Sequence, residues 1–260
     1  RTIWGIPNFW NVVSNVPFLG ALYPAYVMLR RPQLCTHPWE AYAWAGFFAA
    51  VAAVTFGSSY FHWNPNDDTL VWDRLPMTFA FSPLFSLVTG ERVNNALGKG
   101  LLVPLLINGG VSILVWVFTG DLRWYAWVQA FPILVLPVLL ALFPPLYTHA
   151  TSFLWAAAWY VLATVLQSAD KTVWEWSGGM MGGHALKHFA VNGTVWTLHH
   201  MLVTRRRVDP LTGLPGGRYE RCADDEVGAR GTPLLTVDLR SADEGQSSSH
   251  PLESNETARL

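Results

Sequence analysis

The chain has 260 residues, of which 51% are hydrophobic and 13% are charged, and its formal net charge is -1. Soluble domains carry roughly 25% charged residues, so about half of an ordinary polar surface is missing here. Residues 1–203 hold 17 charged side chains, whereas the last 57 residues hold 18. This pattern excludes a soluble enzyme, a nucleic-acid-binding protein and a coiled coil, and it predicts an integral membrane protein.

Seven stretches of the chain are apolar and long enough to cross a bilayer, which takes a helix of about 20 residues. Short polar, glycine or proline segments separate them, and such short connections predict helices that pack against their neighbours in sequence. We therefore expect an all-α membrane protein, built as a seven-transmembrane up-and-down helix bundle. The predicted spans are 9–29, 41–62, 70–89, 100–119, 124–143, 150–167 and 183–204.

Lysine and arginine favour the cytoplasmic side of a membrane protein, and their distribution orients the predicted bundle. Seven of them fall on the side that holds the C-terminus, including the run 205–207, against four on the other side. We expect a cytoplasmic C-terminus. Two domains are predicted, the seven-helix domain over 1–204 and a polar tail over 205–260 that lacks a hydrophobic period and is expected to be disordered.

Ionisable side chains inside an apolar helix are costly, so they indicate function. His184 and His188 lie four residues apart near the start of the last span, and a helix places both imidazoles on one face. This is the spacing at which a helix offers two nitrogens to one metal ion. Ser58 and His62 repeat it at the end of the second span, and Asp73 lies near the start of the third.

The predicted topology brings these side chains together, because the second span ends where the third and the seventh begin. Three imidazoles, from His62, His184 and His188, leave the fourth position of a zinc ion open for water, as in catalytic zinc sites. Asp73 then takes and returns the proton, and Ser58 binds the developing oxyanion or holds the water. We predict zinc ligands at the three histidines and catalytic roles for the other two residues.

A plainer interpretation of the same residues is also open. In it, they are polar contacts that fix helix packing, with Asp73 serving only as the partner of Arg74 and Ser58 as a small helix-packing residue. Other acids, such as Glu40, fall in predicted loops, where we expect water to solvate them.

Three motifs resemble the alkaline ceramidase family, part of a superfamily of seven-helix membrane hydrolases that also includes the adiponectin-type receptors. They are FWNVVSN at 9–15, GSSYFHWNPNDDTLVWDRLPMTFAF at 57–81 and SGGMMGGHALKH at 177–188. The resemblance implies zinc ligands at His62, His184 and His188, with Ser58 and Asp73 at the family's serine and aspartate. It also implies the reaction, hydrolysis of the amide bond of a ceramide to a sphingoid base and a fatty acid.

Calcium is left open as a second metal. The acidic calcium motif that animal and fungal members carry before the first span is not visible, and Asn8 stands where a glutamate of that family is expected.

The expected partners are a ceramide-like lipid and the lipid bilayer, with no nucleic acid and no evident protein partner. The resemblance suggests the endoplasmic reticulum or Golgi for a eukaryotic source and the cytoplasmic membrane for a bacterial one. Two other classes compete with the hydrolase. A receptor of the same superfamily would use a mainly structural zinc site, but the connecting loops here are short. A transporter or proton channel would show broken helices or inverted repeats, and neither is evident in the sequence.

Overall fold

The structure is a computed structural model that describes residues 1–208 and 215. Most of these residues are helical, and none of them belongs to a named strand, so the all-α expectation is confirmed for the described part of the chain. The α-helices are α1 (Phe9–Val13), α2 (Leu22–Arg30), α3 (Pro38–Trp63), α4 (Asp67–Arg92), α5 (Asn95–Thr119), α6 (Arg123–Leu142), α7 (Ser152–Ser168), α8 (Asp170–Trp176) and α9 (Gly183–Thr204). Two 3-10 turns, η1 (Val16–Ala21) and η2 (Pro32–Leu34), complete the set.

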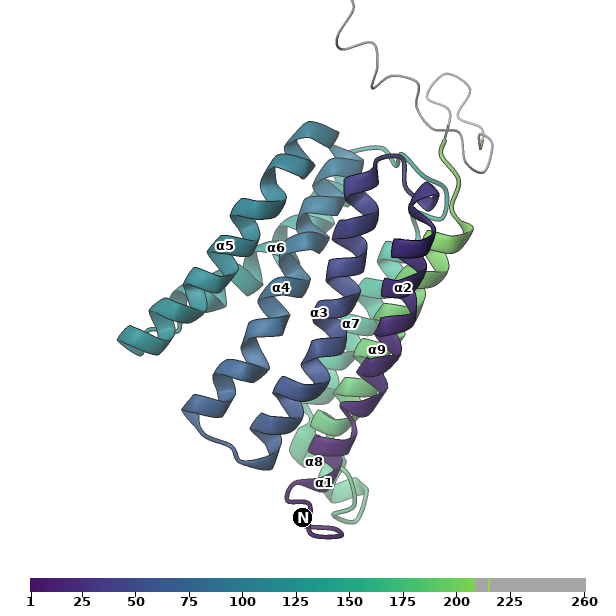
Figure 1. The fold of residues 1–260 in the computed structure, drawn as a ribbon. Coiled ribbons are helices and arrows are strands. Elements are labelled where there is room, and N and C mark those ends of the chain that lie inside the picture. The colour runs from purple at the N-terminus through teal and green to yellow at the C-terminus, as the bar shows by residue number, and fades with distance from the viewer. Residues whose placement is uncertain (209–214, 216–260) are drawn as a thin grey trace, which may run out of the picture. The chain divides into compact units, whose positions relative to one another are not determined.

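The helices pack partly in sequence order (Figure 1). Helix α3 lies between α2 and α4, and α4 packs in turn against α5. Contrary to our expectation, the helices in the second half of the described chain do not all pack against their neighbours in sequence. Helix α6 packs on α4 and α5, whereas α7 pairs closely with α9. The short α8 is bent by 74° from α7, so the chain turns sharply just before α9 begins.

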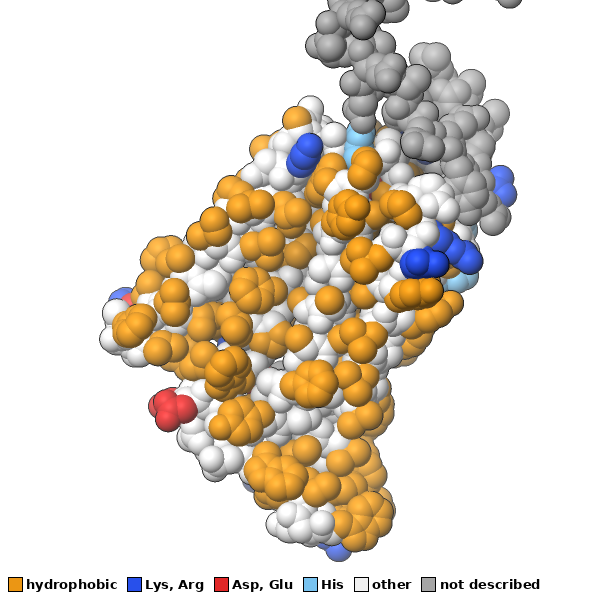
Figure 2. Space-filling view, in the orientation of Figure 1, with side chains coloured by type: hydrophobic (Ala, Val, Ile, Leu, Met, Phe, Trp, Pro, Cys, Tyr) orange, Lys and Arg blue, Asp and Glu red, His pale blue; other side chains and the backbone are white. Residues whose placement is uncertain are grey.

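Several helices are compatible with a multi-pass membrane protein. Four segments of the described chain are long and apolar enough to cross a bilayer, and the bent α7–α8 pair would make a fifth. Helices α4 and α9 do not meet that standard, because α4 carries six charged side chains and α9 carries four histidines and a lysine. On the face shown in Figure 2, hydrophobic side chains cover most of the surface, and the few charged ones lie toward the helix ends.

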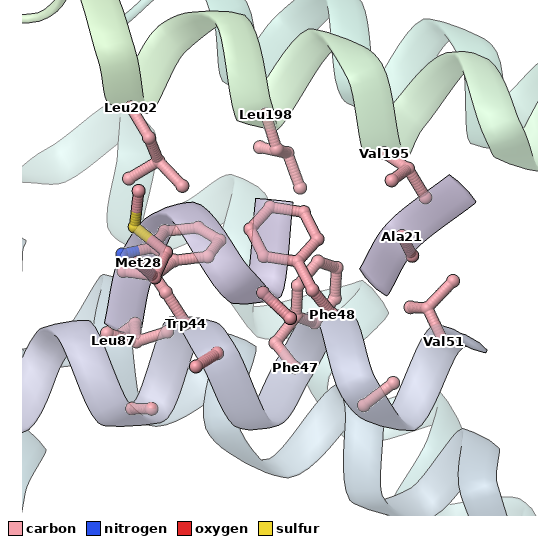
Figure 3. Close-up of a cluster of buried hydrophobic side chains, with 14 of the residues drawn as sticks. Ala21, Met28, Trp44, Phe47, Phe48, Val51, Leu87, Val195, Leu198 and Leu202 are labelled. Atoms are coloured by element: carbon pink, nitrogen blue, oxygen red, sulfur yellow. The ribbon is translucent and has the colours of Figure 1, made fainter. Parts of the chain in front are cut away.

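A buried apolar cluster joins α2 and α3 to α9 (Figure 3). Val195, Leu198 and Leu202 of α9 face Trp44 and Phe48 of α3, while Met28 and Ala21 fill the space beside them. Phe48 and Met28 are fully buried. Lipid is as apolar as these side chains, so close packing of the side chains, rather than their exclusion from water, holds α9 against α3.

A buried charged cluster lies beside the first turn of α3. Arg205, just after α9, contacts Glu91 of α4 with 3.2 Å between Nη1 and Oε2, and its guanidinium carbon lies 3.9 Å from the ring centroid of Tyr147. The Tyr147 hydroxyl donates to Glu40 with 3.1 Å between the oxygens. The solvated loop position expected for Glu40 is therefore wrong. Helix α3 begins at Pro38, and the buried tyrosine hydroxyl replaces water as the hydrogen-bond donor.

The same cluster encloses the free cysteine of the described residues, Cys35. The Arg205 Nη2 atom lies 3.7 Å from its sulfur. Burial raises the pKa of the Cys35 thiol to about 11, so the thiol stays protonated and unreactive at neutral pH.

The predicted polar tail, 205–260, lies mainly outside the described residues. Its first residues are described, and they pack on the bundle rather than leaving it at 204. Arg205 is buried, and the backbone N–H of Val208 donates to the Leu146 carbonyl at 2.9 Å.

The buried arginine gives a stability test. Arg205→Met leaves Glu91 buried beside a single remaining cation, Arg92, and removal of one member of a buried ion pair costs about 3–5 kcal/mol. We expect a clear fall in the melting temperature of the detergent-solubilised protein. The neighbouring Arg206→Met changes an exposed side chain and serves as the control, with an effect within about 0.5 kcal/mol. Equal melting temperatures for the two variants would contradict the role given to Arg205.

Candidate metal centre

Three histidines from two helices meet in one cluster, as the sequence predicts. His62 lies in the last turn of α3, and His184 and His188 lie in the first two turns of α9. The Nε2 atoms of His62 and His184 are 2.9 Å apart, and each of the three histidines offers one ring nitrogen within 4.8 Å of the others. His62 and His188 are buried and His184 is half-buried. The histidine cluster can therefore hold a metal ion.

The donor set of the histidine cluster fits zinc. Zinc takes imidazole nitrogens at about 2.0–2.1 Å in tetrahedral geometry, which separates two ligand nitrogens by roughly 3.3 Å. The His62 and His184 nitrogens, 2.9 Å apart, lie near that separation, and all three ring nitrogens lie within 4.8 Å of one another. Among the described residues three histidines would hold the ion, which is the number of protein ligands in catalytic zinc sites.

A serine that the sequence analysis did not single out orients His188. The Ser14 hydroxyl, at the end of α1, lies 2.8 Å from His188 Nδ1, and both residues are buried. This contact leaves Nε2 of His188 free for the metal. Metal-binding histidines usually engage their second nitrogen in such a bond, which fixes the orientation of the ring. Ser14 falls in the FWNVVSN motif, but only the fold shows that α1 reaches α9.

The start of α9 is capped from another helix. The Gly182 N-cap offers no side chain, and Asp170 of α8 instead accepts the backbone N–H of His184 at 2.7 Å. Gly183 is required for this approach, because a Cβ atom there would overlap the Leu166 carbonyl at the end of α7. The bend between α7 and α8 thus sets the position of the His184 backbone. Residue spacing in the sequence does not predict this bend.

A second close approach holds α4 against α3 next to the cluster. A Cβ atom at Gly57 would overlap the backbone carbonyl of Trp72, so only glycine permits this contact. The approach brings Asp73, which is buried, to the helix that carries Ser58 and His62, and the charge of Asp73 acts on His62. Ser58 is buried one turn before His62.

Asp73 and Ser58 are buried on the two packed helices, α4 and α3, that meet beside His62. Among the described residues, neither makes a hydrogen bond to the three histidines, and the nearest ionic group to Asp73 is Arg74, with 3.7 Å between Nε and Oδ2. The predicted positions of the two residues agree with a role toward a bound water or substrate, and the roles themselves stay predictions.

Asn8 also supports the histidine-bearing helix. Its side-chain amide donates to the His62 carbonyl at 3.0 Å, which ties the N-terminal segment to the end of α3.

Comparisons of this chain with models of protein families, with curated proteins and with solved structures find no match. The resemblance to the alkaline ceramidase family accordingly rests on the three sequence motifs.

The Asp170 cap predicts an effect on metal affinity. Asp170→Ala leaves the His184 N–H without its acceptor and loosens the start of α9. Loss of an outer support of this kind typically weakens metal binding by about 10–100-fold. Asp170→Asn retains an acceptor oxygen and should keep most of the affinity. Titration of the metal-free protein with zinc against a chelator of known affinity measures both.

Glu175→Ala is the control, because that side chain lies on the same short helix and is 62% exposed. Zinc affinity equal to wild type in Asp170→Ala, or an equal loss in the alanine and asparagine variants, would refute a capping role for Asp170.

Proposed function

We propose that the protein is a zinc-dependent integral membrane amidase that hydrolyses the N-acyl amide bond of ceramide-type sphingolipids to a sphingoid base and a free fatty acid. The observation that carries the proposal is the meeting of three largely buried imidazoles at the ends of apolar helices, with the buried carboxyl of Asp73 beside them.

The side chains of the site suit amide hydrolysis. When bound, zinc supplies a Lewis acid that polarises a carbonyl and makes water a nucleophile near neutral pH. The carboxylate of Asp73 accepts a proton from the attacking water and returns it to the leaving nitrogen as the carbon–nitrogen bond breaks. The Ser58 hydroxyl donates a hydrogen bond to the oxygen that gains charge. The Arg74 guanidinium lies beside Asp73, with 3.7 Å between Nε and Oδ2.

The position of the site favours an amphiphilic substrate. His62 ends α3, His184 begins α9, and Asp73 lies in the second turn of α4, so the site lies at helix ends. A lipid there can present its polar head to the histidines while its chains lie along apolar helices. The choice of an amide lipid rests on the resemblance to alkaline ceramidases.

The proposal includes seven spans with the C-terminus in the cytoplasm. Helices α4 and α9 are 26 and 22 residues long, which exceeds the need for one crossing. They fall short only in apolarity, and their polar side chains include Asp73 and His188, which are buried among other helices. A functional site inside a bundle is where ionisable residues of membrane helices are expected.

The first test pairs zinc content with release of fatty acid from ceramides of different acyl length, both on detergent-purified protein. Wild type should contain about one zinc per chain and release fatty acid. His184→Ala should lose most of the metal, whereas Asp73→Asn should keep it and lose activity by about 100-fold or more, since proton transfer contributes 10²–10⁴-fold.

His200→Ala, an exposed histidine of the same helix, is the control and should behave as wild type. Zinc without amide cleavage would reject the ceramidase assignment and favour a receptor with a structural metal. If wild-type protein contains no zinc, the three histidines are polar contacts that fix helix packing.

A further inference from the structure

We propose that residues 8–18, which we call the N-terminal strap, position two of the metal-binding histidines, and that zinc binding and docking of the strap stabilise each other. The strap comprises Asn8, helix α1 and the residues that follow it into η1. The inference rests on the metal centre of the proposed function and is independent of its lipid substrate.

The strap contacts both of the helices that carry the histidine cluster. At its start, the Asn8 side-chain amide donates to the His62 carbonyl in the last turn of α3, at 3.0 Å. After α1, the Ser14 hydroxyl lies 2.8 Å from Nδ1 of His188 on α9. The Phe18 ring then packs edge-on against the His188 ring, with 5.8 Å between the centroids. One short segment therefore joins two helices whose histidines lie far apart in sequence.

Two further hydrogen bonds anchor the strap on α3 without touching a histidine. The Ser59 hydroxyl donates to the Val12 carbonyl at 3.0 Å, and the Thr55 hydroxyl donates to the Asn15 carbonyl at 3.2 Å. Asn15 is completely buried, and Thr55 is buried as well. Ser14 lies between the two anchored carbonyls, so its hydroxyl has a fixed place relative to α3. The ring of His188 is thereby placed from the helix that carries His62.

The contact between Ser14 and His188 acts on both the orientation and the proton of the ring. A neutral imidazole that gives Nε2 to a metal carries its proton on Nδ1, and the Ser14 oxygen accepts that proton in a hydrogen bond. Without Ser14, the ring is free to turn and to carry its proton on either nitrogen. Only part of the protein is then ready to bind metal, and the apparent affinity falls by that fraction.

Coupling of this kind works in both directions. If the docked strap raises the affinity of the histidines for zinc, then zinc must favour the docked strap by the same factor. Supports of metal-binding histidines typically change metal affinity by about 10–100-fold. We therefore expect zinc to shift the docking equilibrium of the strap by a similar factor.

Two measurements on the full-length, detergent-purified chain test the coupling. Competition with a chelator gives the zinc affinity, and hydrogen exchange of the backbone amides of residues 9–15 reports docking of the strap. In wild type, zinc should slow this exchange by about tenfold or more. In Ser14→Ala, the zinc affinity should fall by about 10–100-fold, and zinc should no longer slow the exchange.

Asn8→Gly tests the strap from its other end. Asn8 has a φ of 46°, which glycine adopts without strain, so the substitution removes the amide and keeps the backbone path. The lost hydrogen bond goes to a carbonyl and not to a ring nitrogen. We expect faster exchange of residues 9–15 and a smaller loss of zinc affinity than in Ser14→Ala, with the slowing by zinc retained. Ser168→Ala, which removes an exposed hydroxyl on α7, is the control and should match wild type.

Three results would overturn the coupling. They are equal zinc affinity in Ser14→Ala and wild type, equal slowing of exchange by zinc in the two proteins, and an unchanged zinc affinity in Asn8→Gly although residues 9–15 exchange faster. If Ser14→Ala does not fold, Asn8→Gly carries the test.

The outcome is separable from that of the amidase proposal, because neither measurement needs a lipid. Coupling of the strap to zinc in a protein that cleaves no ceramide overturns the amidase and keeps the strap. Ceramide cleavage without an effect of zinc on the exchange overturns the strap and keeps the amidase. A wild-type protein that binds no zinc overturns the metal centre and the strap together.

Discussion

The approach of the last turn of α3 to the first turn of α9 is the constraint on which the candidate site depends. It leaves 2.9 Å between the ring nitrogens of His62 and His184, segments 122 residues apart in sequence. The apolar cluster of Figure 3 presses the two helices together, and Asp170 and Gly183 fix where α9 begins. Ser14 then turns His188 inward. A metal site with this geometry depends on these supports, because displaced imidazoles bind a shared ion more weakly.

The two ends of the bundle use buried polar groups in different ways. Near the start of α3, Arg205 forms an ion pair with Glu91 and a cation–π contact with the ring of Tyr147. These contacts connect the end of α9 to its neighbours. At the other end, the polar groups converge on one point, where each of three histidines offers a ring nitrogen within 4.8 Å of the others. The second arrangement is typical of a binding site.

Local spacing predicted the histidine cluster, because four-residue separation fixes two histidines on one helix face, and helix direction brought His62 to the same level. Packing between segments that are distant in sequence could not be predicted from residue spacing. Nothing near Ser14 or Asp170 in sequence shows that each supports a histidine of α9. Glu40 resembled a loop residue because its donor, Tyr147, lies 107 residues away. Length and composition alone do not count α4 and α9 as membrane spans, because both helices are long but polar. Only the fold shows which of their polar side chains are buried.

We propose that the three histidines share one zinc ion with an open fourth position. X-ray absorption at the zinc K edge, on detergent-purified wild type beside His184→Ala, tests this directly. We expect three imidazole nitrogens and one further oxygen at about 2.0–2.1 Å in wild type, with fewer imidazoles per zinc and less zinc in the variant. Sulfur in the coordination shell, or a wild-type spectrum with fewer than three imidazoles that His184→Ala leaves unchanged, would contradict it.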